Sequence, residues 1–283
     1  MIDFEGHRSH LRGVAYRMLG SVAEADDAVQ EAWLRLDRAD PRDVANPRGW
    51  LTTVVARVCL DMLRTRTSRR EEPLDPLGPL DPAADRAATT DAQQELMFAE
   101  SVGLALLVVL DRLEPAERLA FVLHDLFGVP FDEIAAIVSR SPDAARQLAS
   151  RARRRVQGSP PPDTDIASQR HVVETFIAAL RRGDVDGLIA VLDPEVVGRA
   201  TDDSGNVREV RGARTWASGA VAFGRLASRM APALIDGAVG LVMAPKGRLL
   251  RALRFAFEGG RIARAEVISD RARLDALDIA VLE

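Results

Sequence analysis

The chain has 283 residues, of which 47% are hydrophobic and 28% charged, and its formal net charge at pH 7 is −4. This length favours two or three domains over one. The negative net charge argues against indiscriminate binding of nucleic-acid phosphates, and a single cysteine excludes an internal disulfide framework. No apolar run reaches the 18 or more residues of a membrane span, and the N-terminus lacks a signal-peptide segment, so we expect a cytoplasmic protein without membrane insertion.

Residues 1–70 are predicted to be helical. Apolar residues recur at helical spacing between Leu11 and Leu19, and Gly20-Ser21 is expected to end that helix and cap the next one. The segment AEADDAVQEAWLRLDR predicts a second helix with an acidic outer face, and a third helix is expected from about Pro47 to Thr65. Cys59 lies within the apolar pattern of this third helix, so we interpret it as a core residue rather than a nucleophile.

Two proline-rich segments divide the chain. Residues 71–90 carry four prolines without helical periodicity and are interpreted as a linker. Residues 158–165, with three consecutive prolines, are interpreted as a second linker. The predicted modules are therefore residues 1–70, 91–157 and 166–283.

The segment SRSPDAARQLASRARRRV, residues 139–156, predicts a basic amphipathic helix. Ser141 followed by Pro142 is a helix-start signal, because the serine oxygen caps the first turn and proline lacks the unsatisfied N–H. A short apolar helix precedes it after about three residues, which favours a helix-turn-helix. Residues 135–157 hold six arginines and one aspartate, a local basic face that fits sequence-directed DNA contact. An ordinary solvated face of a helical pair is the alternative.

The third module changes character. Helices are predicted near residues 165–182 and in the segment that follows, and the apolar runs from Leu234 onward, separated by three turn dipeptides, predict antiparallel strands. This order indicates an α+β fold.

The segments EADDAVQEAWLRL and NPRGWLTTVVARVCLDMLR resemble sigma domain 2 of the extracytoplasmic-function sigma factors, in group four of the sigma-70 family. The segment from LEPAERLAF to RARRRV, residues 113–156, resembles their sigma domain 4. The third module is similar to SnoaL-like domains of the nuclear-transport-factor-two superfamily. The resemblance implies two all-α sigma domains, the second with a helix-turn-helix, followed by an α+β cone with a curved antiparallel sheet. It also implies an alternative sigma factor that binds core RNA polymerase and initiates transcription at promoter DNA, modulated in cis by the third module.

The resemblance also implies three sets of site residues. The set expected to bind core polymerase is Asp26, Asp27, Gln30, Glu31 and Leu34. The set expected near the −10 element is Asn46, Trp50, Arg57 and Arg64, with residues 39–46 as the base-capturing loop. The set expected to face the −35 element is Arg146, Gln147, Ser150, Arg151 and Arg154. The arginines expected to hold phosphates are Arg64, Arg66, Arg69, Arg70, Arg153, Arg154 and Arg155. An acidic solvated helix face and a core role for Trp50 remain open alternatives.

Catalysis, a metal and a cofactor are not expected. The third module has no tyrosine and one histidine, His171, and its Asp193, Asp202 and Asp203 lie in turn-like sequence where aspartate is mostly structural. Whether the module binds a small molecule is left open. The alternative function is a DNA-binding regulator or a SnoaL-like enzyme that acts without core polymerase.

Overall fold

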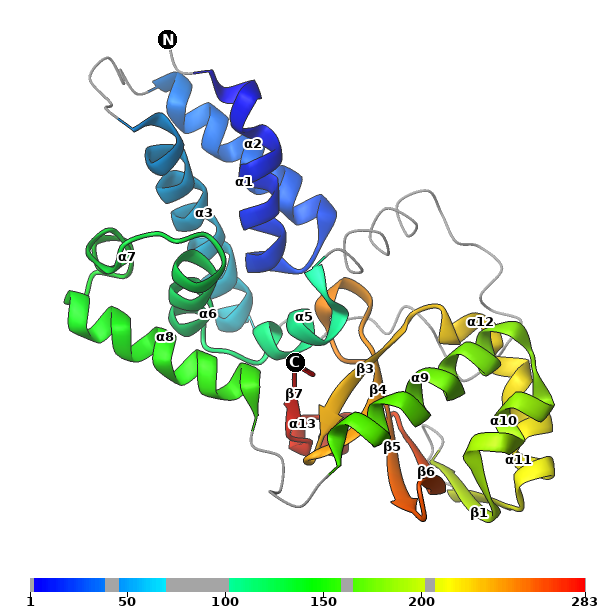
Figure 1. Cartoon of the computed structure of the whole chain (residues 1–283). Helices are drawn as coiled ribbons and strands as arrows, with labels where there is room; N and C mark the ends of the chain where they lie inside the picture. Colours follow the sequence, from blue (N-terminus) through cyan, green and yellow to red (C-terminus); the bar gives the residue numbers. More distant parts are fainter. Residues whose placement is uncertain (1–2, 39–45, 70–101, 159–164, 202–206, 283) are drawn as a thin grey trace. The chain divides into compact units, whose positions relative to one another are not determined.

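The computed structural model describes residues 3–38, 46–69, 102–158, 165–201 and 207–282 (Figure 1). The chain divides into two compact units, which are described separately. The first comprises Met1–Pro73 and Val109–Val156, and the second comprises Leu74–Val108 and Gln157–Glu283. In the described part of the chain, no helix combines the length and hydropathy needed to cross a membrane.

Three helices open the first unit: α1 (Phe4–Leu19), α2 (Val22–Arg38) and α3 (Pro47–Arg69). The predicted stop at Gly20 is confirmed, because this glycine adopts the left-handed conformation and donates its N–H to the carbonyl of Tyr16 at 2.8 Å. The third helix continues one turn beyond the expected end at Thr65. Cys59 is fully buried, as expected of a core residue, and burial raises the pKa of its thiol to about 12.

Shorter helices follow. Helix α5 (Leu104–Asp111) spans the division between the units, which falls after Val108. The first unit then continues with α6 (Pro115–Phe121), a π-helical turn η2 (Val122–Leu126), α7 (Phe131–Val138) and α8 (Pro142–Gln157). Helix α3 contacts both α6 and α7, and α1 contacts η2. The helices of the expected first sigma domain therefore pack in one compact unit with the part of the expected second sigma domain that begins at Val109.

The second unit is α+β, which confirms the predicted class. Its helices are α9 (Ile166–Arg182), α10 (Val185–Val191), α11 (Ala213–Ala220), α12 (Gly224–Ala227) and α13 (Arg271–Ala276). Its strands are β1 (Leu192–Thr201), β2 (Val207–Arg211), β3 (Met230–Ile235), β4 (Ala238–Met243), β5 (Arg251–Glu258), β6 (Arg261–Ile268) and β7 (Ile279–Ala280).

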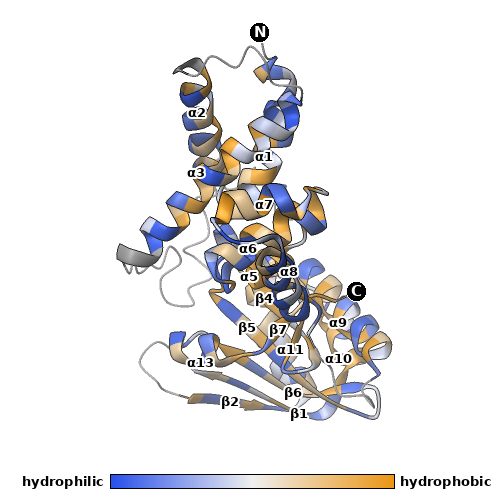
Figure 2. Cartoon of the chain, turned by 90° about the vertical axis from the view of Figure 1, so that its left-hand side faces the viewer, coloured by the Kyte–Doolittle hydropathy of each residue, from blue (hydrophilic) through white to orange (hydrophobic). Residues whose placement is uncertain are grey.

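These strands form one open sheet in the order β2-β1-β6-β5-β4-β3-β7. The predicted antiparallel pairing holds for β3 through β6, whereas β1 and β6 run parallel. The described chain between these two strands passes through the helices α11 and α12 and through four other strands, so no tight turn fixes their relative direction. The alternation of hydrophilic and hydrophobic residues along the strands can be followed in Figure 2.

An aromatic cluster fills the space between the helices and the sheet. Phe176 of α9 is fully buried. The centre of its ring lies 5.5 Å from the ring centre of Trp216 on α11 and 5.3 Å from that of Phe255 on β5. Trp216 packs against Gly198 of β1, where a β-carbon would stand 2.0 Å from the indole nitrogen. The glycine therefore provides the space that the tryptophan occupies.

Candidate nucleic-acid interface

Helices α7 and α8 form the predicted helix-turn-helix. Helix α7 ends at Val138 and is capped by Ser139, whose φ of 56° is left-handed and whose N–H donates to the carbonyl of Ala135. The hydroxyl of Ser141 accepts a hydrogen bond from the N–H of Ala144 at 3.2 Å, and Pro142 is the first residue of α8. The helix start predicted from Ser141 and Pro142 is therefore confirmed, with Ser141 as the N-cap.

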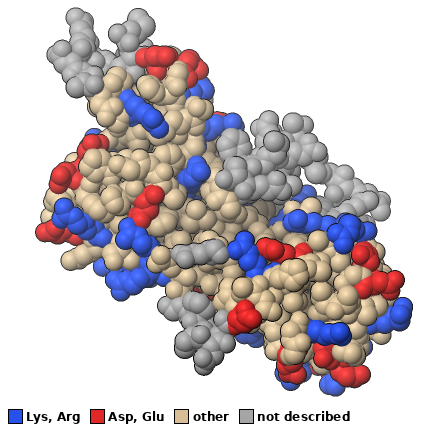
Figure 3. All heavy atoms as spheres, in the orientation of Figure 1, with Lys and Arg blue, Asp and Glu red and all other residues tan. Residues whose placement is uncertain are grey.

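Helix α8 buries its apolar stripe and exposes its polar side. The buried residues are Ala145, Leu148, Ala149 and Ala152. Among the residues expected to face the −35 element, Arg146, Gln147, Arg151 and Arg154 are exposed and Ser150 is half-buried. Figure 3 shows arginines gathered over α8 with carboxylates between them. The helix can therefore present donors to base edges and phosphates.

Carboxylates from the first turn of α8 and from neighbouring segments engage its arginines. Glu117 of α6 accepts from Arg151 at 2.8 Å and from Arg155 at 3.4 Å, and Asp125 of η2 accepts from Arg153. Arg146 is held within its own helix by Asp143. The sequence prediction missed Glu117 and Asp125, because they lie 34 and 28 residues before their partners and carry no local signal.

Arg146 forms an ion pair with Asp143, one turn earlier on α8. Its guanidinium carbon also stands 5.6 Å from the centre of the Phe131 ring, in cation–π geometry. Phe131 in turn stacks on His124, with ring centres 3.8 Å apart. These contacts orient an exposed arginine at the start of the helix, where recognition helices meet base edges.

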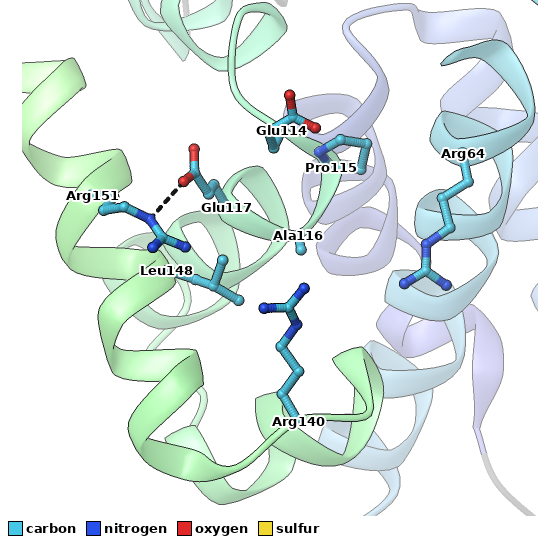
Figure 4. A pocket seen from close by; sticks show the side chains of 8 residues that line it. All are labelled: Arg64, Glu114, Pro115, Ala116, Glu117, Arg140, Leu148 and Arg151. Carbon is cyan, nitrogen blue, oxygen red and sulfur yellow. Dashed lines mark hydrogen bonds and ion pairs between the residues drawn. The ribbon is translucent and has the colours of Figure 1, made fainter. Parts of the chain in front are cut away.

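A hollow of about 490 Å³ lies beside the helix-turn-helix (Figure 4). Its wall includes Arg64 of α3, Arg140 of the turn between α7 and α8, and Arg151. The ion pair between Arg151 and Glu117 crosses one side of it. Arg64 belongs to the set expected near the −10 element, so the fold brings members of two predicted sets together.

Helix α3 and the residue before it hold the described residues of the expected −10 set. Asn46 caps this helix, and its Oδ1 accepts from the N–H of Gly49 at 3.0 Å. Trp50 is half-buried, while Arg57 and Arg64 are exposed. Of the expected base-capturing loop, residues 39–45 lie outside the described residues.

The arginines expected to hold phosphates near the end of α3 are not equivalent. Arg66 donates to both carboxylate oxygens of Glu24 on α2, at 2.5 and 2.6 Å. This ion pair links α2 to α3 across 42 residues of sequence. The side chain of Arg69 and all of Arg70 lie outside the described residues.

The side chain of His10 on α1 contacts two residues near the beginning of α3. Its ring lies 3.0 Å from both Thr52 Oγ1 and Arg48 Nη2. Burial, with the nearby Arg48 charge, lowers the pKa of His10. The neutral ring can accept from the arginine on one nitrogen and donate to the threonine from the other.

Helix α2 carries the residues expected to bind core polymerase on a largely exposed face. Asp26 is paired with Arg12 of α1 at 2.7 Å, and Glu31 is paired with Arg35 one turn later. Asp27 and Gln30 are exposed, and Leu34 is half-buried. This face therefore carries less uncompensated negative charge than the sequence suggests, because two of the three carboxylates in the expected set are already paired with arginines.

Sequence reasoning missed Trp33 on the same helix. Its side chain is 44% exposed, unusual for a large apolar residue, and it lies three residues after Gln30 and seven after Asp26. This helical spacing places it on the same side as both. An exposed aromatic within a polar face is typical of an interaction hot spot, and the spacing was the signal that could have found it.

In the second unit, one of the polar candidates, Asp193, has a structural role. Asp193 accepts a hydrogen bond from the N–H of Glu195 at 2.8 Å, as in an Asx turn. His171 is an exposed residue of α9. Asp202 and Asp203 lie outside the described residues. Within the described ranges, no group of three or more histidine, cysteine, aspartate or glutamate residues is arranged to hold a metal ion.

Comparisons with known proteins agree with these features. Residues 4–69 match the family described as Sigma-70 region 2, and residues 103–156 match Sigma-70, region 4. The ECF RNA polymerase sigma factor SigJ of Mycobacterium tuberculosis is 46% identical over 218 residues, which cover 74% of this chain and 68% of that protein. The probable ECF sigma factor SigI of the same species is 41% identical over 196 residues, covering 69% and 67%.

A crystal structure of the extracytoplasmic function sigma factor SigJ of Mycobacterium tuberculosis is 34% identical in sequence to this chain. The aligned region covers 96% of this chain and 97% of the SigJ chain, with a TM-score of 0.48. The two sigma regions, in this order, together with the identity to SigJ identify the protein's class. The chain belongs to the family of extracytoplasmic-function RNA polymerase sigma factors and is an alternative sigma factor.

Proposed function

We propose that this sigma factor docks on core RNA polymerase through α2, contacts the −10 element from α3 and reads the −35 element with α8. The observation that carries the proposal is the geometry of α8, a capped helix with a buried apolar stripe and an exposed row of arginine and glutamine. Arginine can make two hydrogen bonds to guanine and glutamine two to adenine, so this face suits base readout in the major groove.

Core docking is assigned to the exposed side of α2. Asp27 is exposed and has no ion pair among the described residues, and the side chain of Trp33 is partly exposed. A carboxylate and an exposed aromatic on the same helix fit a partner surface with arginines around an apolar hollow. The partners Arg12 and Arg35 hold Asp26 and Glu31 in fixed positions, which lowers the entropy cost of presenting them.

The −10 contacts are assigned to Trp50, Arg57 and Arg64. Trp50 is half-buried, so part of its ring stays available for stacking on an unpaired base. Arg57 and Arg64 are exposed on the same helix, seven residues apart, and can follow the DNA backbone. Asn46 is engaged as a helix cap, so its contribution is to fix where α3 begins.

The second unit is proposed to modulate this activity in cis. Its interior is filled by Phe176, Trp216 and Phe255, and its described polar candidates are capping or exposed residues. These features favour a regulatory contact surface over a reaction site. The reducing cytoplasm, where core polymerase works, is the compartment we expect.

Run-off transcription with core polymerase tests the proposal. Genomic fragments are transcribed with the full chain and with a chain truncated after Gln157, whose helical content is checked by circular dichroism. Transcripts that require both core polymerase and the protein are expected. Higher output from the truncated chain would show restraint by the C-terminal module, and lower output would show assistance. Specific duplex binding by the free chain, without any association with core polymerase, would contradict the proposal.

A charge reversal tests the docking face. Asp27→Lys is expected to weaken association with core polymerase at least tenfold, because a cation would meet the arginines expected on the partner. Asp61→Lys is the matched control, since Asp61 is also an exposed helical carboxylate of the first unit but lies on α3. Equal loss in both variants would show a general charge effect and not a docking face.

A further inference from the structure

Glu117 is a buried carboxylate that faces the recognition helix from α6. Its side chain is only 7% exposed. Oε1 accepts from Arg151 Nε at 2.8 Å, and Oε2 accepts from Arg155 Nη1 at 3.4 Å. A carboxylate buried to this extent is costly unless it is paired, so the two arginines are its required partners.

The contact leaves most of the Arg151 fork available. Only Nε of Arg151 bonds to Glu117, and no described contact occupies its two terminal nitrogens (Figure 4). Those two nitrogens are the pair that meets the O6 and N7 atoms of guanine in bidentate readout. Glu117 therefore fixes the orientation of the guanidinium while leaving its reading edge open.

The same carboxylate restrains non-specific attraction. Arg151 and Arg155 are about half exposed, and without a partner both would contribute freely to phosphate binding. A fixed negative charge beside them reduces that contribution, which is independent of sequence and depends on salt. Arginines that are held in place beside a negative charge therefore discriminate better between the correct bases and phosphates at unrelated sequences.

We propose that Glu117 is a positioning residue for −35 recognition, which aims Arg151 at a base and holds Arg155 beside it. This inference rests on the proposed function, because it needs α8 to read promoter DNA. Asp125 holds Arg153 of the same helix in a similar way from η2. The recognition surface is thus set partly by acidic residues outside the helix that reads the DNA.

Holoenzyme reconstituted from core polymerase and the full chain provides the test. A promoter found by run-off is prepared with every single substitution across its −35 element, and binding is measured for each at several salt concentrations. Glu117→Gln keeps the shape of the side chain but removes its charge. Glu114→Gln is the matched control, because Glu114 lines the same hollow, is exposed and forms no described ion pair.

Two opposite changes are expected from Glu117→Gln. Discrimination at the base read by Arg151 should fall about tenfold, the scale of one lost base contact. Affinity for unrelated DNA should rise, and the slope of log affinity against log salt should steepen by about one unit as an arginine is released to phosphates. Glu114→Gln should change neither discrimination nor slope at that position.

A purely structural role would not move specific and non-specific binding in opposite directions. If specific and non-specific binding fall together in Glu117→Gln, Glu117 only stabilises the fold and the proposal is overturned. The proposal is also overturned if this variant binds DNA as the wild type does. In an Arg151→Gln background, Glu117→Gln should cause no further loss at that base, and an additive loss would also overturn it. If the wild-type holoenzyme shows no dependence on the −35 sequence, the proposed function itself has failed.

Discussion

Arg118 on α6 donates a hydrogen bond from Nε to the backbone carbonyl of Arg17 on α1, 3.2 Å away and 101 residues earlier in the chain. The Arg118 side chain is 2% exposed, and burial lowers the pKa of its guanidinium to about 10. Its nearest carboxylate, Asp111, stands 3.6 Å from Nη1. Among the described residues Nη2 has no hydrogen-bond partner. A buried cation with incomplete pairing thus joins the two helical halves of the first unit.

Removing the partner of this cation should cost more than removing the cation. Asp111→Asn is expected to lower the free energy of opening around α6 by about 1 to 3 kcal/mol, because it leaves a buried charge without compensation. Arg118→Met should stay within about 1 kcal/mol of the wild type, since an apolar chain of similar length avoids the desolvation cost. Hydrogen exchange of peptides that cover α6 measures both.

The double variant separates charge from shape. Asp111→Asn in the Arg118→Met background should add almost no loss, because the charge that needs compensation is gone. An undiminished loss in the double variant would show that Asp111 acts through other contacts.

Asn46 allows capping to be separated from promoter contact. Asn46→Ala should destabilise the start of α3 by about 1 kcal/mol, because the N–H of Gly49 loses its acceptor. Asn46→Asp should keep the helix, since aspartate caps equally well. Transcription from a promoter that depends on its −10 element is the measurement. We expect it to be lost in the alanine variant, which lacks the cap, and kept in the aspartate variant, which retains it. Equal loss in both variants would assign Asn46 a direct DNA contact.

Gly198 should not accept a larger side chain. In Gly198→Ala the new carbon would stand 2.0 Å from Trp216 Nε1, so the indole must leave its place beside Phe176. A loss of about 1 to 3 kcal/mol of stability in the second unit is expected, with altered tryptophan fluorescence. Gly219→Ala on α11 is the matched control, because nothing lies within 4 Å of its added carbon. That variant should gain up to about 1 kcal/mol from helix propensity.

The stability of the first unit should fall on mild acidification. Burial and Arg48 lower the folded-state pKa of His10 below its unfolded value near 6.5, so the unfolded chain binds the proton more readily. The stability contributed by neutral His10 is therefore present above about pH 6.5 and declines as the pH falls toward its folded-state pKa. The ring contacts Arg48, Thr52 and Phe127, and the nearby His7 also lowers the pKa of His10.

Hydrogen exchange of α1 peptides between pH 7.5 and 5.5, corrected for intrinsic rates, measures this effect. His10→Gln should flatten the pH dependence. His171→Gln, which changes an exposed histidine of the second unit, should leave it unaltered. A dependence that persists in His10→Gln would assign the titration to another group.

Local chemistry made much of the helix-turn-helix predictable. Ser141, Pro142 and the apolar spacing of α8 act within one or two helical turns, so the start of the helix and its buried face follow from neighbouring residues. The same reasoning located the stop at Gly20 and the burial of Cys59. The α+β class of the C-terminal module also followed from the order of helical and strand patterns. The individual binding roles of the site residues stay predictions.

The amino-acid sequence by itself determined the class of each module, the cap and basic face of α8 and the acidic residues of α2, because these depend on periodicity and on contacts a few residues apart. Only the tertiary structure decided which charges remain free. Glu117 meets Arg151 and Arg155, Glu24 meets Arg66, and β1 pairs in parallel with β6. Such partners lie tens of residues apart, and many arrangements of the same charges are equally compatible with the local pattern until packing brings one set together.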